Sequence, residues 1–361
     1  MSFYEILIWI MALFAVMGAL DRIFGNRFGL GKQFEEGILA MGALALAMVG
    51  IITLAPVLAT LLQPVIGPVY RFLGADPAMF AGTILANDMG GGALAYELTD
   101  DPQAAALGGV ITGSMLGATV VFIIPVAMGI LKEEDRPALA KGVLAGVVTI
   151  PLGVLVGGLV AGFNILMVLR NLIPIVLIAL LIALGLWKAE KAMIKGFGWF
   201  GKGVIALITV GLAAALVEEL TGFTVIPGMA SISEGFQTVG AIAIVLAGAF
   251  PLVFLLTKVL RKPLSRLGRL LGINESAAAG LIASLANAIA TFGLVKDMDN
   301  RGKVVNIAFG VSAAFVFGDH LGFTAGFAPE YLPAVIVAKL TGGISAVAVA
   351  LLLTRSSGER R

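Results

Sequence analysis

The sequence predicts an all-α polytopic integral membrane protein built from two inverted-topology repeats. Three observations lead to this fold class: the composition, a series of long apolar stretches, and an internal repeat. Of the 361 residues, 59% are hydrophobic and only 13% are charged, and the mean hydropathy is +1.04. A soluble domain carries about a quarter charged residues. The chain is therefore expected to face lipid over much of its surface.

Eleven apolar stretches are candidates for helices that cross roughly 30 Å of hydrocarbon. They cover residues 3–20, 37–62, 78–98, 104–131, 138–162, 165–187, 203–219, 236–257, 276–295, 304–323 and 332–354. The first stretch has no basic residue before it, and its first charge is Glu5, which is the reverse of a secretory signal peptide. We expect a retained first helix with the N-terminus outside. The tail, residues 355–361, is expected to be disordered.

The chain also contains an internal repeat. When it is shifted by 198 residues, positions 34–84 align with the second half without a gap, and Glu36 aligns with Glu234. Fifteen of the 49 positions from 36 to 84 are then identical. We therefore expect one repeat over residues 1–162 and a second over 200–354. Residues 163–199 would form a connecting helix and a basic cytoplasmic loop.

The distribution of Lys and Arg predicts how the repeats are oriented, because these residues gather in cytoplasmic loops. If residues 77–98 and 275–296 are re-entrant hairpins, 21 of the 24 basic residues fall on one side. The exceptions are Arg71, Arg170 and Lys339. The prediction is about nine crossing helices plus two re-entrant hairpins, with a cytoplasmic C-terminus; eleven crossing helices are the alternative. Inverted repeats are common in secondary transporters.

The tip of the first hairpin has the sequence NDMGGG, in which Asn87 and Asp88 precede three glycines. Glycines allow a sharp turn. A carboxylate inside the bilayer costs at least about 2.5–3.5 kcal/mol and is usually functional. A bound cation would reduce this cost. The alternative is a structural Asp88 that caps a helix or pairs with a distant Lys or Arg.

The other candidate residues are polar groups on apolar segments. In the repeat register Asp88 aligns with Ala286, while Asp319 and His320 align with apolar residues, so polar groups occur in one copy only. The predicted substrate-binding residues are Asp88, Asn87, Asn287, Asp319, His320, Glu36 and Glu234, with the backbone of Gly90, Gly91 and Gly92 at the hairpin tip. A Glu in the first turn of a helix is also favourable through the helix dipole alone. His320 is either a proton site or a structural partner of Asp319, and its position suits a gate as well as a binding site.

Several classes of function are excluded. The chain has no cysteine and one histidine, so we expect no disulfide, metal site or cofactor, and the net charge of +2 gives no reason to expect a nucleic-acid partner. No phosphate-binding loop or nucleophile–base pair indicates an enzyme. A single polar tip favours alternating access over a continuous pore, with proton or sodium coupling left open. The small-residue faces at Gly109/Gly113/Gly117 and Gly153/Gly157 suit either a homo-oligomer or internal packing.

The stretches QFEEGILAMGALALAMVG (33–50), NDMGG (87–91) and residues 274–326 resemble the ethanolamine-utilisation inner-membrane transporter family. The resemblance implies a bacterial inner-membrane permease that imports ethanolamine. For that substrate Asp88 would supply the charge, and Asn87 and Asn287 hydrogen bonds. Phe292 and Phe80 would be aromatic walls, with ordinary lipid or core contacts as the alternative. A carrier of another small cation or amino acid, and a non-transporting scaffold for ethanolamine-metabolising enzymes, are the alternatives.

Overall fold

The computed structural model describes residues 3–354, and gives only the backbone for residues 3–4 and part of 257–269. All regular elements in that range are helical, so the predicted all-α class is confirmed. The tail that we expected to be disordered, 355–361, lies outside the described residues. Within residues 3–354, seven helical stretches are long and apolar enough to cross a membrane. The chain is a multi-pass membrane protein.

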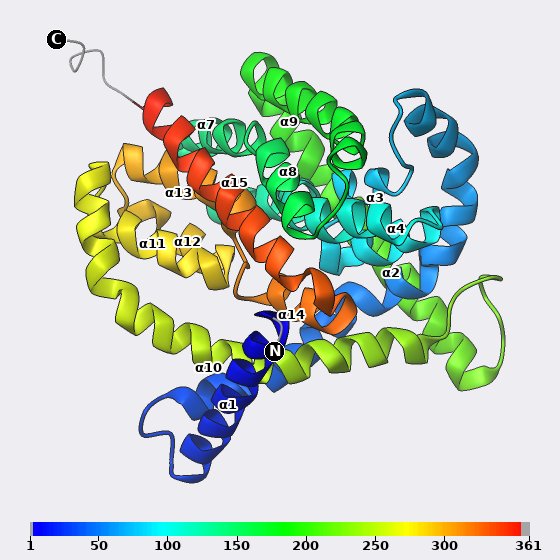
Figure 1. Ribbon diagram of the computed structural model, residues 1–361, viewed down its shortest axis with the longest axis horizontal. Helices are drawn as coiled ribbons and strands as arrows, with labels where there is room; N and C mark the ends of the chain where they lie inside the picture. The colour runs from blue at the N-terminus through cyan, green and yellow to red at the C-terminus, as the bar shows by residue number, and fades with distance from the viewer. Residues whose placement is uncertain (1–2, 355–361) are drawn as a thin grey trace.

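The helices fall into long rods and short broken pieces (Figure 1). The long helices are α1 (Phe3–Ile23), α2 (Leu30–Phe72), α9 (Ile165–Thr221), α10 (Ile232–Leu271) and α15 (Leu332–Leu353). The shorter ones are α3 (Met79–Ile84), η1 (Asn87–Gly91), α4 (Gly92–Leu98), α5 (Pro102–Ala105), η2 (Ala106–Gly117), η3 (Thr119–Ile123), α6 (Ile124–Ile130), η4 (Glu133–Asp135), α7 (Arg136–Val147), α8 (Ile150–Val160), α11 (Glu275–Ala286), α12 (Ala288–Leu294), η5 (Val295–Asp297), α13 (Asn300–Ala313), α14 (Asp319–Phe327) and η6 (Pro329–Tyr331).

Helix α9 corrects one expectation. The basic loop was expected within 163–199, but from Ile165 onward this segment is helical except for a single break at Ala189. The stretch around the break, WKAEKAMIK, is rich in good helix formers. A Cβ on Gly185 would lie 2.7 Å from the Met193 sulfur, although residues eight apart in a straight helix are about 12 Å apart. The chain therefore folds back sharply at Ala189, and α9 contains two of the expected apolar segments.

Helices α2 and α10 pack against each other in a reciprocal way. A Cβ on Gly37 would lie 2.6 Å from the backbone of Ala247, and a Cβ on Gly235 would lie 2.8 Å from the Val49 side chain. Gly37 aligns with Gly235, and Val49 with Ala247, under the shift of 198 residues. Replacing each residue of one contact by the residue aligned with it in the other repeat therefore gives the other contact.

The helices that flank this pair repeat the same arrangement. Gly50 of α2 packs against the carbonyl oxygen of Ile208 in the second half of α9. Gly248 of α10, which aligns with Gly50, packs against the carbonyl oxygen of Met11 in α1. The second half of α9 therefore packs against α2 in the same way as α1 packs against α10.

Two helix–break–helix units lie on opposite sides of the molecule (Figure 1). In each unit the end of the second helix lies close to the start of the first, where a hydrogen bond joins them. In hairpin 1, residues 76–99, the Thr99 hydroxyl donates to the Asp76 carboxylate at 2.9 Å. In hairpin 2, residues 274–299, the Asn274 side-chain amide donates to the Asp297 carbonyl oxygen at 2.8 Å. Each of these base residues aligns with its counterpart under the shift of 198 residues.

The small-residue faces found in the sequence pack inside this chain. The first lies on the π-helical segment η2 and supports the backbone of hairpin 1, where Gly109, Gly113 and Gly117 face Gly91, Asn87 and Leu85 respectively. The second lies on α8, where Gly153 and Gly157 face Ala338 of α15. Close backbone approach through small residues is typical of helices packed in membranes. Both faces are therefore used for internal packing in the protomer.

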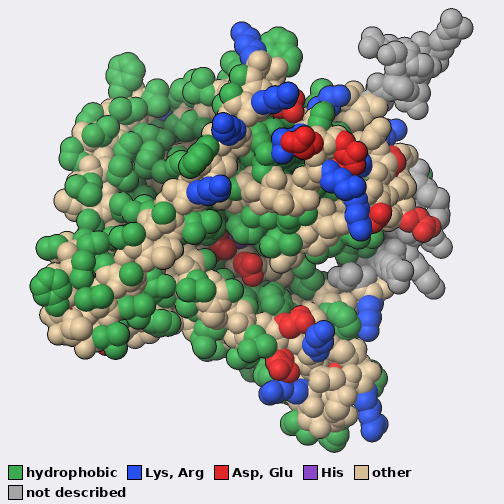
Figure 2. Space-filling view, turned by 180° about the vertical axis from the view of Figure 1, so that it is seen from behind, with side chains coloured by type: hydrophobic (Ala, Val, Ile, Leu, Met, Phe, Trp, Pro, Cys, Tyr) green, Lys and Arg blue, Asp and Glu red, His purple; other side chains and the backbone are tan. Residues whose placement is uncertain are grey.

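The surface fits a protein that sits in lipid. Figure 2 shows a face dominated by apolar side chains, with Lys and Arg gathered mostly in the right-hand half of the view. Acidic side chains lie in a hollow near the centre of this face (Figure 2).

Candidate functional site

The tip of hairpin 1 places Asp88 where a helix has been interrupted. Helix α3 ends at Ile84, and Leu85 and Ala86 are extended before the chain turns. The amides of Met89 and Gly91 donate to the Ala86 carbonyl oxygen, at 3.1 and 2.8 Å. Gly90 has φ +96°, a conformation that residues with a side chain rarely adopt. The glycine-rich turn that the sequence predicts is therefore present, and it holds Asp88 at the tip.

The tip of hairpin 2 places Asn287 at the corresponding break. Helix α11 ends at Ala286, and Asn287 is extended with φ −156°. Its side-chain oxygen accepts a hydrogen bond from the Ile289 amide at 2.7 Å, which caps α12. Because the oxygen is used in this way, the Asn287 NH₂ group remains as the donor that a ligand can meet.

A second break lies beside hairpin 2 and corrects another expectation. The segment 304–323, predicted as one helix, is interrupted between α13 and α14 at residues 314–318. The amides of Phe315 and Phe317 instead donate to the carbonyl oxygens of Ser284 and Leu285, both at 2.9 Å, at the end of α11. This exchange of hydrogen bonds starts α14 at Asp319, which brings that residue next to the hairpin tip.

The two tips and the break enclose one cavity of about 390 Å³. Asp88, Asn287, Asp319 and His320 line it, so four of the predicted binding residues meet although they lie far apart in sequence. The remaining wall is apolar and comprises Ala40, Ala43, Leu44, Ala47, Ala86, Met89, Phe122, Phe250, Ile289 and Phe315. A concave, mostly apolar site with a few convergent polar groups is typical of small-molecule binding.

The aromatic walls differ from those expected. Phe292 is 4% exposed and packs in the core, and Phe80 packs edge-on against Tyr70 with ring centroids 6.2 Å apart. The cavity wall is made instead by Phe250 and by Phe122 and Phe315, which pack edge to face 5.4 Å apart. Phe292 and Phe80 do not line this cavity, whereas Phe315 lines it because it lies in the break at 314–318.

Behind the cavity lies a charged residue that the sequence analysis did not place in the site. Lys339 is on α15 and only 1% exposed. Its Nζ donates to the Ser114 carbonyl oxygen at 2.5 Å and contacts His320 Nδ1 at 3.0 Å. The ring Nε2 of His320 lies 3.7 Å from Asp88 Oδ1. Asp88, His320 and Lys339 therefore form a line that runs from the cavity into the core.

The contact with Lys339 links the tautomer of His320 to the charge of the lysine. An ammonium group has three donors and no acceptor. When Lys339 is protonated, His320 Nδ1 accepts from it, and the neutral ring then carries its proton on Nε2, the atom that faces Asp88. When both carboxylates are ionised and Lys339 is protonated, the cluster carries one uncompensated negative charge. A single monovalent cation would neutralise it.

The other predicted binding residues do not line the cavity. Asn87 is fully buried, and its amide nitrogen and oxygen have no hydrogen-bond partner. Glu36 is half-exposed and pairs on the surface with Lys32 at 3.9 Å and Gln33 at 3.0 Å. Glu234 is exposed near the start of α10. The dipole interpretation suits Glu234, which stands in the first turn of its helix.

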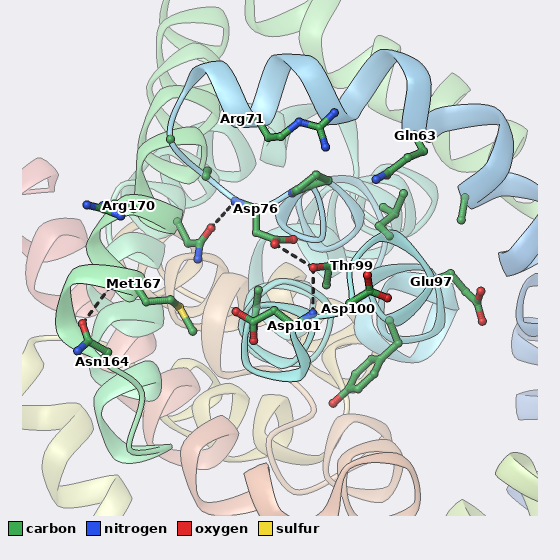
Figure 3. Close-up of a pocket in the computed structure, with 18 of the residues that line it drawn as sticks. Gln63, Arg71, Asp76, Glu97, Thr99, Asp100, Asp101, Asn164, Met167 and Arg170 are labelled. Carbon is green, nitrogen blue, oxygen red and sulfur yellow. Dashed lines mark hydrogen bonds between the residues drawn. The ribbon is translucent and has the colours of Figure 1, made fainter.

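A second, larger cavity of about 1180 Å³ lies at the base of hairpin 1 (Figure 3). We call it the vestibule. Its charged lining is Arg71, Asp76, Glu97, Asp100, Asp101 and Arg170. Figure 3 shows Asp76, Thr99 and Asp101 joined by hydrogen bonds, with Arg71 and Arg170 further out. Four carboxylates against two guanidinium groups make the vestibule acidic.

Asp76 is the structural centre of the vestibule. Its backbone amide donates to the Asn171 side chain at 2.7 Å, and its carboxylate accepts from the Ala78 amide at 2.8 Å as well as from Thr99. Burial raises the pKa of the Asp76 carboxyl above its ordinary value, against the opposing effect of these hydrogen bonds. Asp76 therefore joins hairpin 1 to α9, and its polar atoms are largely used in hydrogen bonds within the protein.

The chain is similar over its length to proteins of ethanolamine utilisation. The family described as ethanolamine utilisation protein, EutH, matches residues 3–353. The probable ethanolamine permease EutH of Listeria monocytogenes is 61% identical over 353 residues, which cover 98% of this chain and 95% of that protein. The probable ethanolamine permease EutH of Salmonella typhimurium is 49% identical over 391 residues, with 98% and 96% covered. The uncharacterized protein YxeR of Bacillus subtilis is 49% identical over 361 residues, with 100% and 98% covered. No solved structure matches the chain.

Proposed function

Because the chain belongs to the family of ethanolamine utilisation protein EutH, we propose that it imports protonated ethanolamine across a bacterial inner membrane by alternating access. The family is one of permeases and not of enzymes. The observation that carries the proposal is the small cavity lined by two carboxyl groups, Asp88 and Asp319, with a single lysine, Lys339, behind it. A buried site with this charge favours a small monovalent cation.

The polar groups of the cavity match the two ends of ethanolamine. The amine has a pKa near that of lysine, so it is almost wholly an ammonium ion at neutral pH. Its three N–H donors can be shared by the carboxylates of Asp88 and Asp319. The hydroxyl oxygen can accept from the Asn287 NH₂ group, whose own oxygen is engaged in capping α12. Phe122 and Phe315 supply aromatic rings for cation–π attraction.

Alternating access requires a site that is open to one side at a time, and the fold offers a way to divide the molecule. Every polar lining residue comes from hairpin 1, hairpin 2 or α14. The part of the wall contributed by α2 and α10 is apolar, with Ala40, Ala43, Leu44, Ala47 and Phe250. A smooth apolar surface holds no polar contact that must break when the hairpins move past it. In this proposal the hairpins, the first half of α9 and α13–α15 move together against α1, α2, the second half of α9 and α10.

Inverted repeats would let the same movement expose the site to either side. The reciprocal contacts of α2 with α10, and the matching hairpin bases, support a two-fold relation between the repeats. In this arrangement hairpin 1 enters from outside and hairpin 2 from the cytoplasm, with nine crossing helices. The N-terminus lies outside and the C-terminus in the cytoplasm.

The test is uptake of labelled ethanolamine into proteoliposomes at acid pH, where unaided permeation of the neutral base is low. Asp88→Asn should reduce uptake roughly ten- to hundredfold, the cost of losing a hydrogen bond to a charged group. Glu36→Gln is the matched control, because it removes a carboxylate outside the cavity and should leave uptake unchanged. Imposed proton and sodium gradients in the same vesicles show whether transport is coupled to either ion.

Two outcomes would contradict the proposal. If folded wild-type protein gives no ethanolamine uptake, the substrate or the transport role is wrong. If Asp88→Asn retains full uptake, the cation is bound elsewhere.

A further inference from the structure

Lys339 stands in an unusual place for a lysine. It is the eighth residue of the 22-residue helix α15, it is 1% exposed, and it does not line the cavity. Neither of its two hydrogen-bond partners, the Ser114 carbonyl oxygen and His320 Nδ1, is a carboxylate. Burying an ammonium group is costly unless opposite charge lies nearby. The nearby charge comes from the cavity, through His320.

His320 keeps Lys339 out of the cavity while holding it within electrostatic reach. The ring separates Lys339 Nζ from Asp88 Oδ1, with contacts of 3.0 Å on one side and 3.7 Å on the other. The two charges are therefore within roughly 9 Å of each other, and at an effective dielectric constant of about 20 their interaction changes a binding constant by roughly tenfold or more. A substrate cannot reach Lys339 directly, but its second positive charge would be repelled by it.

We propose that Lys339 is a specificity-determining residue: a fixed internal cation that limits the cavity to one monovalent ammonium and excludes dications such as short diamines. The inference rests on the proposed function, since it takes the cavity as the amine site. With Lys339 present, one bound ammonium neutralises Asp88 and Asp319. Without it, two negative charges remain for the ligand, which suits a diamine or an ammonium together with sodium.

The test compares two molecules of equal length that differ at one end, 1,3-diaminopropane and 3-amino-1-propanol. The diamine carries a second ammonium near neutral pH where the amino alcohol carries a hydroxyl. Each competes with labelled ethanolamine for uptake into proteoliposomes of wild type, Lys339→Met, Lys339→Arg and the surface control Lys132→Met. Lys132 pairs on the surface with Glu134.

In wild type the amino alcohol should compete better than the diamine. In Lys339→Met the ratio should shift toward the diamine by roughly tenfold, whereas Lys339→Arg and Lys132→Met should keep the wild-type preference. Asp319→Asn combined with Lys339→Met restores the single negative charge and should restore the preference for the amino alcohol. A diamine that competes better than the amino alcohol in wild type, or an unchanged ratio in folded Lys339→Met, would overturn the proposal.

A substitute variant and a binding measurement test the proposal if Lys339→Met does not fold or if wild type shows no uptake. If Lys339→Met does not fold, Lys339→Gln retains a donor for the Ser114 carbonyl oxygen and is tested in its place; the wild-type comparison stands in either case. If wild type shows no ethanolamine uptake, the proposed function fails, and the preference is then read from ligand-induced shifts in the thermal unfolding midpoint. A larger shift with the diamine than with the amino alcohol in wild type would reject the role of Lys339 independently of transport.

Discussion

Replacing Gly90 with alanine should distort the hairpin tip that carries Asp88. Gly90 has φ +96°, and its Cβ would press on the side chain of Ile51, which is fully buried in α2. An unfavourable backbone conformation costs about 1–2 kcal/mol, and overpacking a buried site typically costs about 1–3 kcal/mol more. We expect a loss of about 2–5 kcal/mol in total and a weaker apparent affinity for ethanolamine, since Asp88 is two residues away.

The assay is the thermal unfolding midpoint of purified protein, measured with uptake, for Gly90→Ala, Ile51→Ala and the double variant. The single change at Gly90 should lower the midpoint by at least about 3 °C, because a chain of 361 residues loses about 0.8 kcal/mol of stability per degree near the midpoint. Ile51→Ala makes room for the new methyl group, so the double variant should be less destabilised than the sum of the single variants by about 1–3 kcal/mol. Gly129→Ala, on α6 with no atom within 4 Å of its Cβ, is the control and should not destabilise. A Gly90→Ala protein as stable as wild type, or strictly additive effects, would refute the steric argument.

Two further predictions concern the membrane side of each hairpin base and the charge of the vestibule. Short tags at 74–75 and at 99–100 should be accessible from the same face of the membrane, and tags at 272–273 and 298–299 from the opposite face; labelling of either pair from different faces would mean that the hairpin crosses. Glu97→Gln and Asp100→Asn remove exposed charges from the vestibule, so each should raise KM for ethanolamine about two- to threefold at low ionic strength and hardly at all at high salt. Equal KM values for wild type and variants at low salt would show that the vestibule does not attract the substrate.

The parts of the site that could be predicted from sequence are those with a local signal. The run NDMGGG predicts a break with a carboxylate beside it, and the structure has that break. Asp319 and His320 stood out because their aligned positions in the first repeat are apolar, and Asn287 because it lies within the segment predicted as the second hairpin; the structure brings all three to the cavity. Each of these residues can be identified from the sequence alone, without knowing which residues surround it in the folded protein.

The parts that could not be predicted depend on how backbones exchange hydrogen bonds. Nothing local in SAAFVFGDH indicates that Phe315 and Phe317 will bond to the end of α11 instead of continuing their own helix. That exchange decides which phenylalanines face the cavity. Asn87 and Asp88 show the same limit, since adjacent residues point to different surroundings and only Asp88 lines the cavity.

The three basic residues that break the charge rule of the loops show how topology and site are connected. Arg71 and Arg170 line the acidic vestibule, and Lys339 lies behind the carboxylates of the cavity. Each is therefore close to excess negative charge: four carboxylates in the vestibule, and Asp88 and Asp319 in the cavity. A charged residue within the membrane is costly and usually pairs with a group of opposite charge. In the proposed topology, these exceptions to the charge rule mark where acidic groups gather along the proposed route of the cation, and Lys339, the most deeply buried of the three, is the one expected to set what that route accepts.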